Sequence, residues 1–211
     1  MPRTATLSQW IAAAAAAMSF VCAQAQPVGK LFESPLGNFS VPAPAGMGAR
    51  AQHQGDKDGG IVAFHDDFGS YRSVFYLRLS PRSLELRADA QAHRRNLEDF
   101  FKIYAMERLF LPATAGAKQL HGEHLMFGNE SAYFALVDLP ASSTMFNART
   151  NQRFDTRRGM LVFASGAFIY MVGSGENPSV MQLGAPAPAL DKLVQAERVK
   201  ALAFAAGMVF K

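Results

Sequence analysis

Two neighbouring segments in the last third of the chain are apolar at almost every position, and they limit the folds that the sequence can adopt. They are Met160–Ala164 and Phe168–Val172, with Ser165-Gly166 between them. A two-residue connection that ends in glycine, between segments rich in β-formers, predicts a tight hairpin. Strands that are apolar at successive positions are buried on both faces. The sheet that contains this hairpin must therefore be covered on both sides.

Two long amphipathic helices are predicted, one in the middle of the chain and one near its end. The first covers about 88–109, where apolar residues recur every three or four positions, and Pro112 ends it. The second covers about 190–205 and is followed by Gly207. Each helix needs an apolar surface to cover. The two helices are therefore expected on the two faces of the sheet.

Further β-rich segments precede and follow the first helix. They are a hairpin with its turn at Pro35–Gly37, and single strands at 61–66, 73–80, 118–127 and 131–140. The glycine-rich stretch "QHQGDKDGG" between the hairpin and these strands is interpreted as a polar loop. Strands joined by short turns form antiparallel sheets. The predicted fold class is thus α+β, with an antiparallel β-sheet flanked by helices on both faces as a three-layer α/β/α sandwich.

The first 25 residues have the pattern of a secretory signal peptide. Residues 10–21 form an apolar run of about a dozen residues, shorter than the roughly 20 that span a bilayer. Ala23 and Ala25 provide the small-x-small pattern that precedes cleavage. Lipid attachment at Cys22 would require a small residue directly before the cysteine and an aliphatic residue three positions before it. Val21 and Ser19 occupy these two positions, so a lipid anchor is disfavoured. We expect cleavage after Ala25, a periplasmic or secreted location, and a single globular domain over 26–211.

Composition excludes several classes of function for the mature chain. Cleavage would remove Cys22, the one cysteine, and with it any disulfide or cysteine-based metal site. The formal net charge of +4 is far from the strong basic stripe of a nucleic-acid-binding protein, so no nucleic-acid partner is expected. The mature chain also contains no apolar run long enough for a transmembrane segment.

The stretch "QLHGEHLMFG" places two histidines three positions apart with a glutamate between them. On a strand, side chains alternate between the two faces, so His121 and His124 would point to opposite sides and could not bind one ion. His121 and Glu123 would share a face, but zinc needs a third protein ligand and none is close in sequence. We therefore predict no metal site and no cofactor, and interpret these residues as polar side chains of a half-exposed strand.

The stretch "HDDFGSYR" contains the residue types of an acid–base site, namely His65, Asp66 and Asp67. Neighbouring carboxylates and imidazoles can shift one another's pKa, although the same residues are typical of a turn. A small metal-dependent or acid–base enzyme that combines these residues with His121 and Glu123 is the alternative function. It requires that the two histidines face one pocket. Nucleophile-elbow, phosphate-loop and dinucleotide motifs are absent from the sequence.

Four arginines lie close together in "NARTNQRFDTRR", opposed by one acid, Asp155. They are Arg149, Arg153, Arg157 and Arg158. Arginine forks bind carboxylates and phosphates with two parallel hydrogen bonds, and loops on rigid scaffolds often carry binding function. Charges at a strand start also keep sheet edges from aggregating, which is the alternative interpretation. The hypothesis is that this segment docks an anionic surface, either an acidic protein or a phosphate-bearing envelope lipid.

Three stretches together resemble the PsbP-like group of proteins. They are "GNFSVPAP", "IVAFHDDF" and "RRGMLVFASGAFIYMVGSG", the last of which precedes a terminal helix. The resemblance extends over roughly 31–210 and is one of pattern, without a diagnostic motif. It implies an antiparallel sheet with helices on both faces, in a family of accessory and partner-binding proteins that share no catalytic site. The sequence thus predicts an exported, non-enzymatic binding or accessory protein without an assigned catalytic residue.

Overall fold

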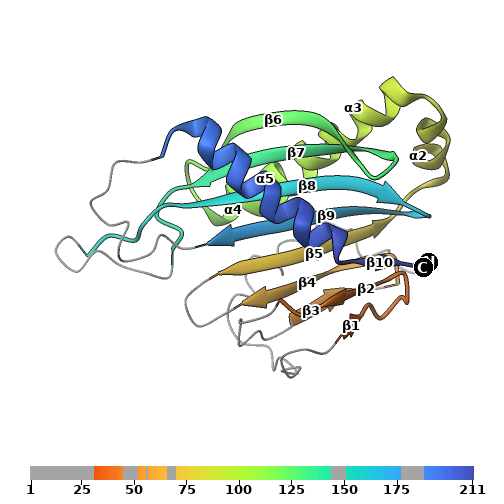
Figure 1. Ribbon diagram of the computed structural model, residues 1–211, viewed down its shortest axis with the longest axis horizontal. Coiled ribbons are helices and arrows are strands. Elements are labelled where there is room, and N and C mark those ends of the chain that lie inside the picture. The colour runs from red at the N-terminus through yellow and green to blue at the C-terminus, as the bar shows by residue number, and fades with distance from the viewer. Residues whose placement is uncertain (1–30, 45–51, 56, 66–69, 144–150, 177–187) are drawn as a thin grey trace, which may run out of the picture.

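A computed structural model describes residues 31–44, 52–55, 57–65, 70–143, 151–176 and 188–211, and the statements below concern these residues. Most of the strands form one seven-stranded antiparallel sheet (Figure 1). Its strands, in spatial order, are β3 (Gln52–Gly55), β4 (Gly59–His65), β5 (Tyr71–Arg78), β9 (Phe168–Glu176), β8 (Thr156–Ser165), β7 (Glu130–Leu139) and β6 (Lys118–Phe127). The predicted signal peptide lies outside the described residues.

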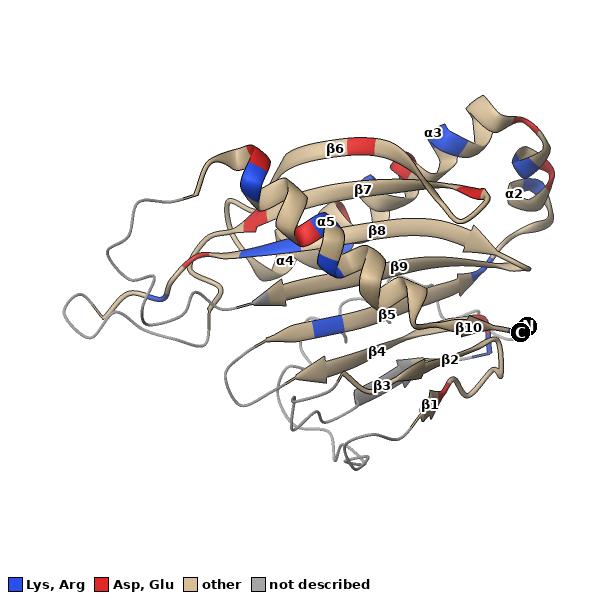
Figure 2. Cartoon of the chain, viewed as in Figure 1, with Lys and Arg blue, Asp and Glu red and all other residues tan. Residues whose placement is uncertain are grey.

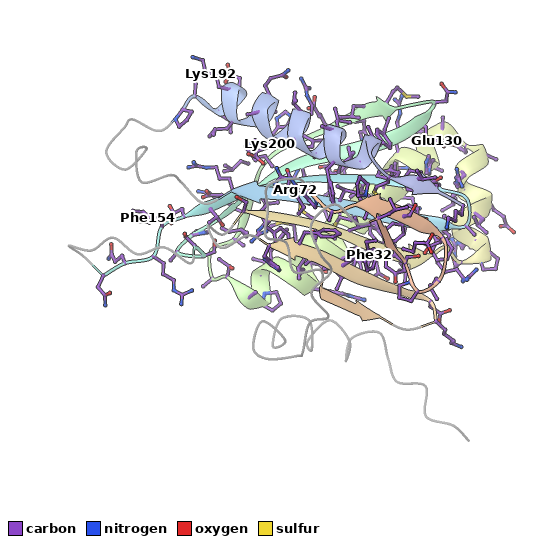
Figure 3. The ribbon with its side chains drawn as sticks, turned by 60° about the horizontal axis from the view of Figure 1, so that its bottom comes forward. Phe32, Arg72, Glu130, Phe154, Lys192 and Lys200 are labelled. Carbon is purple, nitrogen blue, oxygen red and sulfur yellow. The ribbon has the colours of Figure 1, made fainter. Side chains whose placement is uncertain are left out.

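A second, smaller antiparallel sheet lies beside the first. Its strands, in spatial order, are β1 (Leu31–Glu33), β2 (Phe39–Pro42) and β10 (Val209–Phe210). The predicted N-terminal hairpin is therefore present, but it pairs with the end of the chain and not with the main sheet. Phe32 of this sheet, labelled in Figure 3, packs edge-on against Phe64 of β4, and the two ring centroids lie 6.2 Å apart.

The helices fall into two groups along the chain. The first comprises α2 (Pro81–Glu85), the 3-10 turn η1 (Leu86–Ala88), α3 (Ala90–Phe100), the π-helix η2 (Phe101–Phe110) and α4 (Leu111–Ala113), and the second is α5 (Leu190–Ala206). Asp89 caps α3, because its side chain accepts hydrogen bonds from the backbone N–H groups of Gln91 and Ala92 at 2.8 and 3.0 Å. The helical run passes Pro112, which occupies the first turn of α4, where its missing N–H is not needed.

The two helix groups contribute to two separate apolar clusters. α5 contacts β8 and β9, and its Ala201 belongs to a cluster with Phe163 and the small-sheet residue Phe39. α3 contacts β7 and β8, and its Leu97 belongs to a cluster with Phe101 and Val162. The mixed α+β class predicted from the sequence is confirmed.

The apolar hairpin is confirmed, and it lies at the centre of the main sheet. β8 and β9 pair from Arg157 to Ser165, and Gly166 turns between them with φ +55°, a conformation that favours glycine. Leu161 and Val162 are fully buried although they point to opposite faces. The strands therefore need cover on both faces, as their apolar pattern predicts.

The interpretation of one polar stretch as a loop was wrong. The stretch "QHQGDKDGG" is not a loop, since it contains the edge strand β3 and the first residues of β4, which pair from Gln52 to Ala63. An edge strand is bonded through its backbone and needs no apolar side chains. At Gly59 a Cβ would lie 2.4 Å from the backbone oxygen of Tyr76, so the close approach of β4 and β5 requires glycine there. Across the described residues, no helix has the length and apolar character needed to cross a membrane.

Candidate functional site

The two histidines of β6 lie on opposite faces of the sheet, as strand alternation predicts. His121 and Glu123 face α5, and the His121 Nε2 lies 3.5 Å from the Glu123 Oε1. His124 faces α3, where its Nε2 lies 3.4 Å from the Glu98 Oε2. The sequence prediction that one ion cannot be shared by His121 and His124 is consistent with this arrangement.

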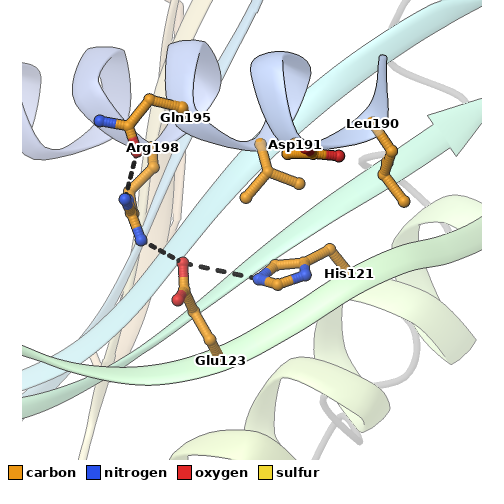
Figure 4. A pocket seen from close by; sticks show the side chains of 7 residues that line it. His121, Glu123, Leu190, Asp191, Gln195 and Arg198 are labelled. Carbon is orange, nitrogen blue, oxygen red and sulfur yellow. Dashed lines mark hydrogen bonds and ion pairs between the residues drawn. The ribbon is translucent and has the colours of Figure 1, made fainter.

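A cavity of about 320 Å³ lies between β6 and the first turns of α5 (Figure 4). Its lining is His121, Glu123, Leu190, Asp191, Val194, Gln195 and Arg198. Arg198 donates a hydrogen bond from Nη1 to the Glu123 Oε1 at 2.8 Å and another from Nη2 to the Gln195 side chain. The guanidinium therefore links the helix to the strand, and two of its nitrogens are engaged within the protein.

The charges in this cavity are balanced, which limits its chemistry. The lining contains two basic side chains, Arg198 and His121, and two acidic ones, Glu123 and Asp191. The α5 N-terminus adds partial positive charge. No group of three histidine, cysteine or acidic side chains that could hold a metal ion occurs in the part of the chain that the structure describes. The contribution of α5 was missed by sequence reasoning. Its signal was the spacing of Asp191, Gln195 and Arg198, which places them along one helix stripe.

The alternative acid–base site is not assembled among the described residues. His65 ends β4, and the strands β5, β9, β8 and β7 separate β4 from β6. The His65 ring lies 5.1 Å from the Tyr71 ring, on the face opposite Phe64, whereas His121 faces α5. Asp66 and Asp67 lie outside the described residues. The two histidines therefore do not face one pocket.

The two last arginines of the arginine-rich segment begin β8 and point to opposite faces of the sheet. The Arg157 Nε lies 3.4 Å from the Asp138 Oδ1, and the Lys118 Nζ lies 3.9 Å from the Asp138 Oδ2. Two cations thus share one carboxylate, and their side chains are 34% and 64% exposed. Figure 2 shows the resulting basic segment at the start of β8.

Arg158 has a different environment. Its guanidinium carbon lies 3.9 Å from the centre of the Tyr71 ring, and its side chain runs alongside Gly175, where a Cβ would lie 3.1 Å from the Arg158 Cγ. The Arg158 Nη1 is shielded from solvent and has no hydrogen-bond partner. Burial lowers the pKa of Arg158, and the nearby Tyr71 and Glu197 oppose this shift. Arg158 is therefore a packed cation on the face opposite Arg157.

The remaining members of the segment are only partly described. Arg153 is exposed and lies close to the start of β8, whereas Arg149 lies outside the described residues. Asp155, the one acid in the segment, accepts a hydrogen bond from the Ala141 N–H at 2.9 Å, which ties the two chain segments together. Within the described residues, Arg153, Arg157 and Lys118 are thus accessible cations near the start of β8.

No family model and no curated protein sequence matches this chain. Solved structures that resemble it include a protein of Bacteroides thetaiotaomicron (TM-score 0.45, 11% identity, 87% of this chain and 49% of that one). Another is cyanobacterial PsbP of Synechocystis, with a TM-score of 0.45 and 10% identity, over 92% of this chain and 99% of that one. A third is the Ran-binding protein Mog1p of Saccharomyces cerevisiae, with a TM-score of 0.43 and 10% identity, over 86% of this chain and 94% of that one. The chain spans about half the length of the Bacteroides protein. Cyanobacterial PsbP is thus among the solved structures that this chain resembles, while partner and activity have to be inferred from the chain's own residues.

Proposed function

We propose that this chain is an exported, non-enzymatic binding or accessory protein that docks an acidic partner protein through the basic end of its main sheet. The observation that carries the proposal is the sharing of Asp138 by two cations, Lys118 and Arg157, at 3.9 and 3.4 Å. One carboxylate cannot neutralise two cations, so positive charge remains available at the surface. Arg153 adds an exposed guanidinium to the same end.

Two features favour a carboxylate-bearing partner. The shared Asp138 means that this end of the sheet already binds a carboxylate within the molecule, and arginine forks match the planar geometry of carboxylates. Complementary charge across an interface speeds association and selects partners, even where each exposed pair adds little affinity. A phosphate-bearing envelope lipid offers similar charge and is an outcome that the experiment below distinguishes.

The export component of the proposal rests on the sequence. The apolar run at 10–21 and the small residues before Gln26 support cleavage after Ala25 and a periplasmic or secreted mature chain. We also infer a three-layer α/β/α arrangement, supported by the separate apolar clusters of α5 and α3. Helix cover on both faces leaves the strand ends as the natural place for docking.

The test uses the mature chain from Gln26, with immobilised poly-L-glutamate and phosphatidylglycerol vesicles as probes. Changing Arg153→Glu and Arg157→Glu together should weaken binding to poly-L-glutamate by about tenfold, because two exposed charges are reversed. The matched control is the pair Arg82→Glu and Arg94→Glu, exposed arginines on α2 and α3. This control should bind like the unchanged chain, and raised salt should weaken binding because exposed charges are screened.

Equal binding by the double variant and the control would reject docking through this end of the sheet. Binding to the vesicles without binding to poly-L-glutamate would identify a lipid surface and reject the acidic protein partner. Since Arg157→Glu places two carboxylates beside each other, the pair Arg153→Gln and Arg157→Gln provides a milder second variant. Thermal unfolding of each variant checks that lost binding does not arise from lost folding.

A further inference from the structure

The imidazole ring of His93, on α3, is buried without any hydrogen-bond partner. Its side chain is 4% exposed, and neither ring nitrogen has a partner or access to solvent. Buried polar side chains are hydrogen-bonded in most proteins, because a missing partner costs free energy. This imidazole therefore fits its site only in the neutral form, and it stands out among the described histidines.

The surroundings of His93 join three parts of the molecule. Arg87 of η1 donates a hydrogen bond from Nη1 to the backbone oxygen of Gly166, in the β8–β9 turn, at 2.6 Å. The Arg87 Nη2 also lies 3.2 Å from the Glu130 Oε1, at the β6–β7 turn. We call α2, η1 and the first turn of α3, Pro81–His93, the helical arm. Arg87 ties this arm to both hairpin turns, at the end of the molecule opposite Phe154 (Figure 3).

Two charged groups act on His93, one from each side of this junction. Burial and the Arg87 guanidinium on η1 lower the pKa of His93, and the Glu130 carboxylate on β7 opposes them. The pKa therefore lies below the ordinary value of 6.5. Neither ring nitrogen has an acceptor within hydrogen-bond distance, and the backbone oxygen of Asp89 accepts a hydrogen bond from the backbone N–H of His93 at 2.8 Å.

We propose that His93 is an acid-sensitive switch whose protonation releases the helical arm from the β6–β7 and β8–β9 turns. A proton on the ring creates a buried cation that has no acceptor and lies near a second cation, Arg87. Water can reach the ring when the arm opens, and this hydrates the charge. Opening breaks the two contacts of Arg87, which are the described polar links between η1 and the turns.

The direction of the response follows from the lowered pKa. The opened form takes up the proton first, so the closed arm is fully stable above about pH 6.5 and loses stability as the pH falls toward the pKa of the closed form. His121 and His124 differ from His93 in their surroundings, because a ring nitrogen of each lies within 3.5 Å of a carboxylate oxygen. The switch is therefore assigned to His93 alone among these three.

The test is amide hydrogen exchange of the mature chain between about pH 7.5 and about pH 5, which bracket the ordinary histidine pKa. Rates are divided by intrinsic rates at the same pH, because exchange itself depends on pH. Between the His93 pKa of the open form and the lower His93 pKa of the closed form, protection of the helical arm should fall by up to about tenfold per pH unit. Protection of β7 and β8 should stay constant over the same range.

Two variants and one control separate His93 from general acid effects. His93→Leu and His93→Gln cannot titrate, so each should keep arm protection constant between these pH values. His124→Leu, which removes a histidine with a carboxylate neighbour, should retain the acid response. Constant arm protection in the unchanged chain would overturn the proposal, as would an equal acid loss in both His93 variants. If neither variant folds, the His93 ring titration in the unchanged chain decides, since titration at the ordinary value would also overturn it.

Discussion

On each face of the main sheet, a helix carries one buried ionisable side chain, and the two side chains differ in whether they have hydrogen-bond partners. Glu197 of α5 is 8% exposed, accepts a hydrogen bond from the Ser174 Oγ at 3.2 Å, and pairs with the Lys200 Nζ at 2.9 Å. His93 of α3 is 4% exposed and has no partner. A buried charge with hydrogen-bond partners helps to hold its helix on the sheet. A buried polar ring without partners adds no such contact, and it is tolerated only while it stays neutral.

This difference follows from how closely each helix approaches the sheet. At Gly159 of β8 a Cβ would lie 3.0 Å from both the Cβ and the backbone oxygen of Glu197, so glycine allows α5 to lie directly on the strand. The corresponding contacts of α3 and η2 are made by larger apolar side chains, including Leu97 of α3 and Phe101 of η2. We conclude that apolar packing dominates the attachment of α3, whose Glu98 contacts His124 of β6 in a partly exposed pair, while α5 has a buried polar attachment in addition to its apolar contacts.

The largest effect is expected when the apolar attachment of the α3–η2 helical run is weakened at Phe101, the first residue of η2. Phe101 is fully buried, so Phe101→Ala should lower the free energy of unfolding by about 3–5 kcal/mol through lost burial and a cavity. Urea denaturation followed by circular dichroism measures this change. On the same helix, Ile103 is 38% exposed, and Ile103→Ala should cost about 1 kcal/mol or less. Similar losses for the two variants would contradict apolar anchoring of this layer.

The next effect concerns the polar attachment of α5. Glu197→Ala leaves the buried Ser174 hydroxyl without its acceptor, so the free energy of unfolding should fall by about 1–3 kcal/mol. Glu197→Gln keeps an acceptor and should cost less. Glu107→Ala, at an exposed position of η2, should change stability by about 0.5 kcal/mol or less. Thermal and urea unfolding report all three. If Glu197→Ala matched Glu107→Ala, α5 would have no polar attachment and the two faces would be equivalent.

The sequence was sufficient for those parts of the fold that follow from a local period. The period of two in β6 predicts opposite faces for His121 and His124, and the apolar stripe of the first helix extends back by one turn to His93. The same period of two also separates Arg157 from Arg158, so treating the arginines as one surface overlooked their alternation. Burial of His93 could thus have been read from the helix stripe, although the missing partner could not.

Other features depend on the tertiary arrangement and leave no local signal. β9 lies between β5 and β8, which no turn in the sequence indicates. The contact between Arg198 and Glu123 exists because α5 crosses toward β6, and β3 is bonded through a polar edge whose composition is that of a loop. The glycines at 159 and 175 read as ordinary small residues until the helix or arginine beside them is known.

The smallest effect tests whether surface charges on α3 and η2 compensate for the missing hydrogen-bond partner of the His93 ring. The Lys102 Nζ lies 2.7 Å from the Glu98 Oε1, and this pair is 51% and 32% exposed. The hydrogen bond from Lys102 lowers the pKa of Glu98, yet solvent screens an exposed pair. Lys102→Ala should therefore cost about 0.3–0.5 kcal/mol in urea denaturation, and less at raised salt. A loss as large as that of Glu197→Ala would mean that the contact of Glu98 with His124 attaches α3 to β6 as strongly as Glu197 attaches α5. The two faces would then differ in where the polar attachment lies and not in how strong it is.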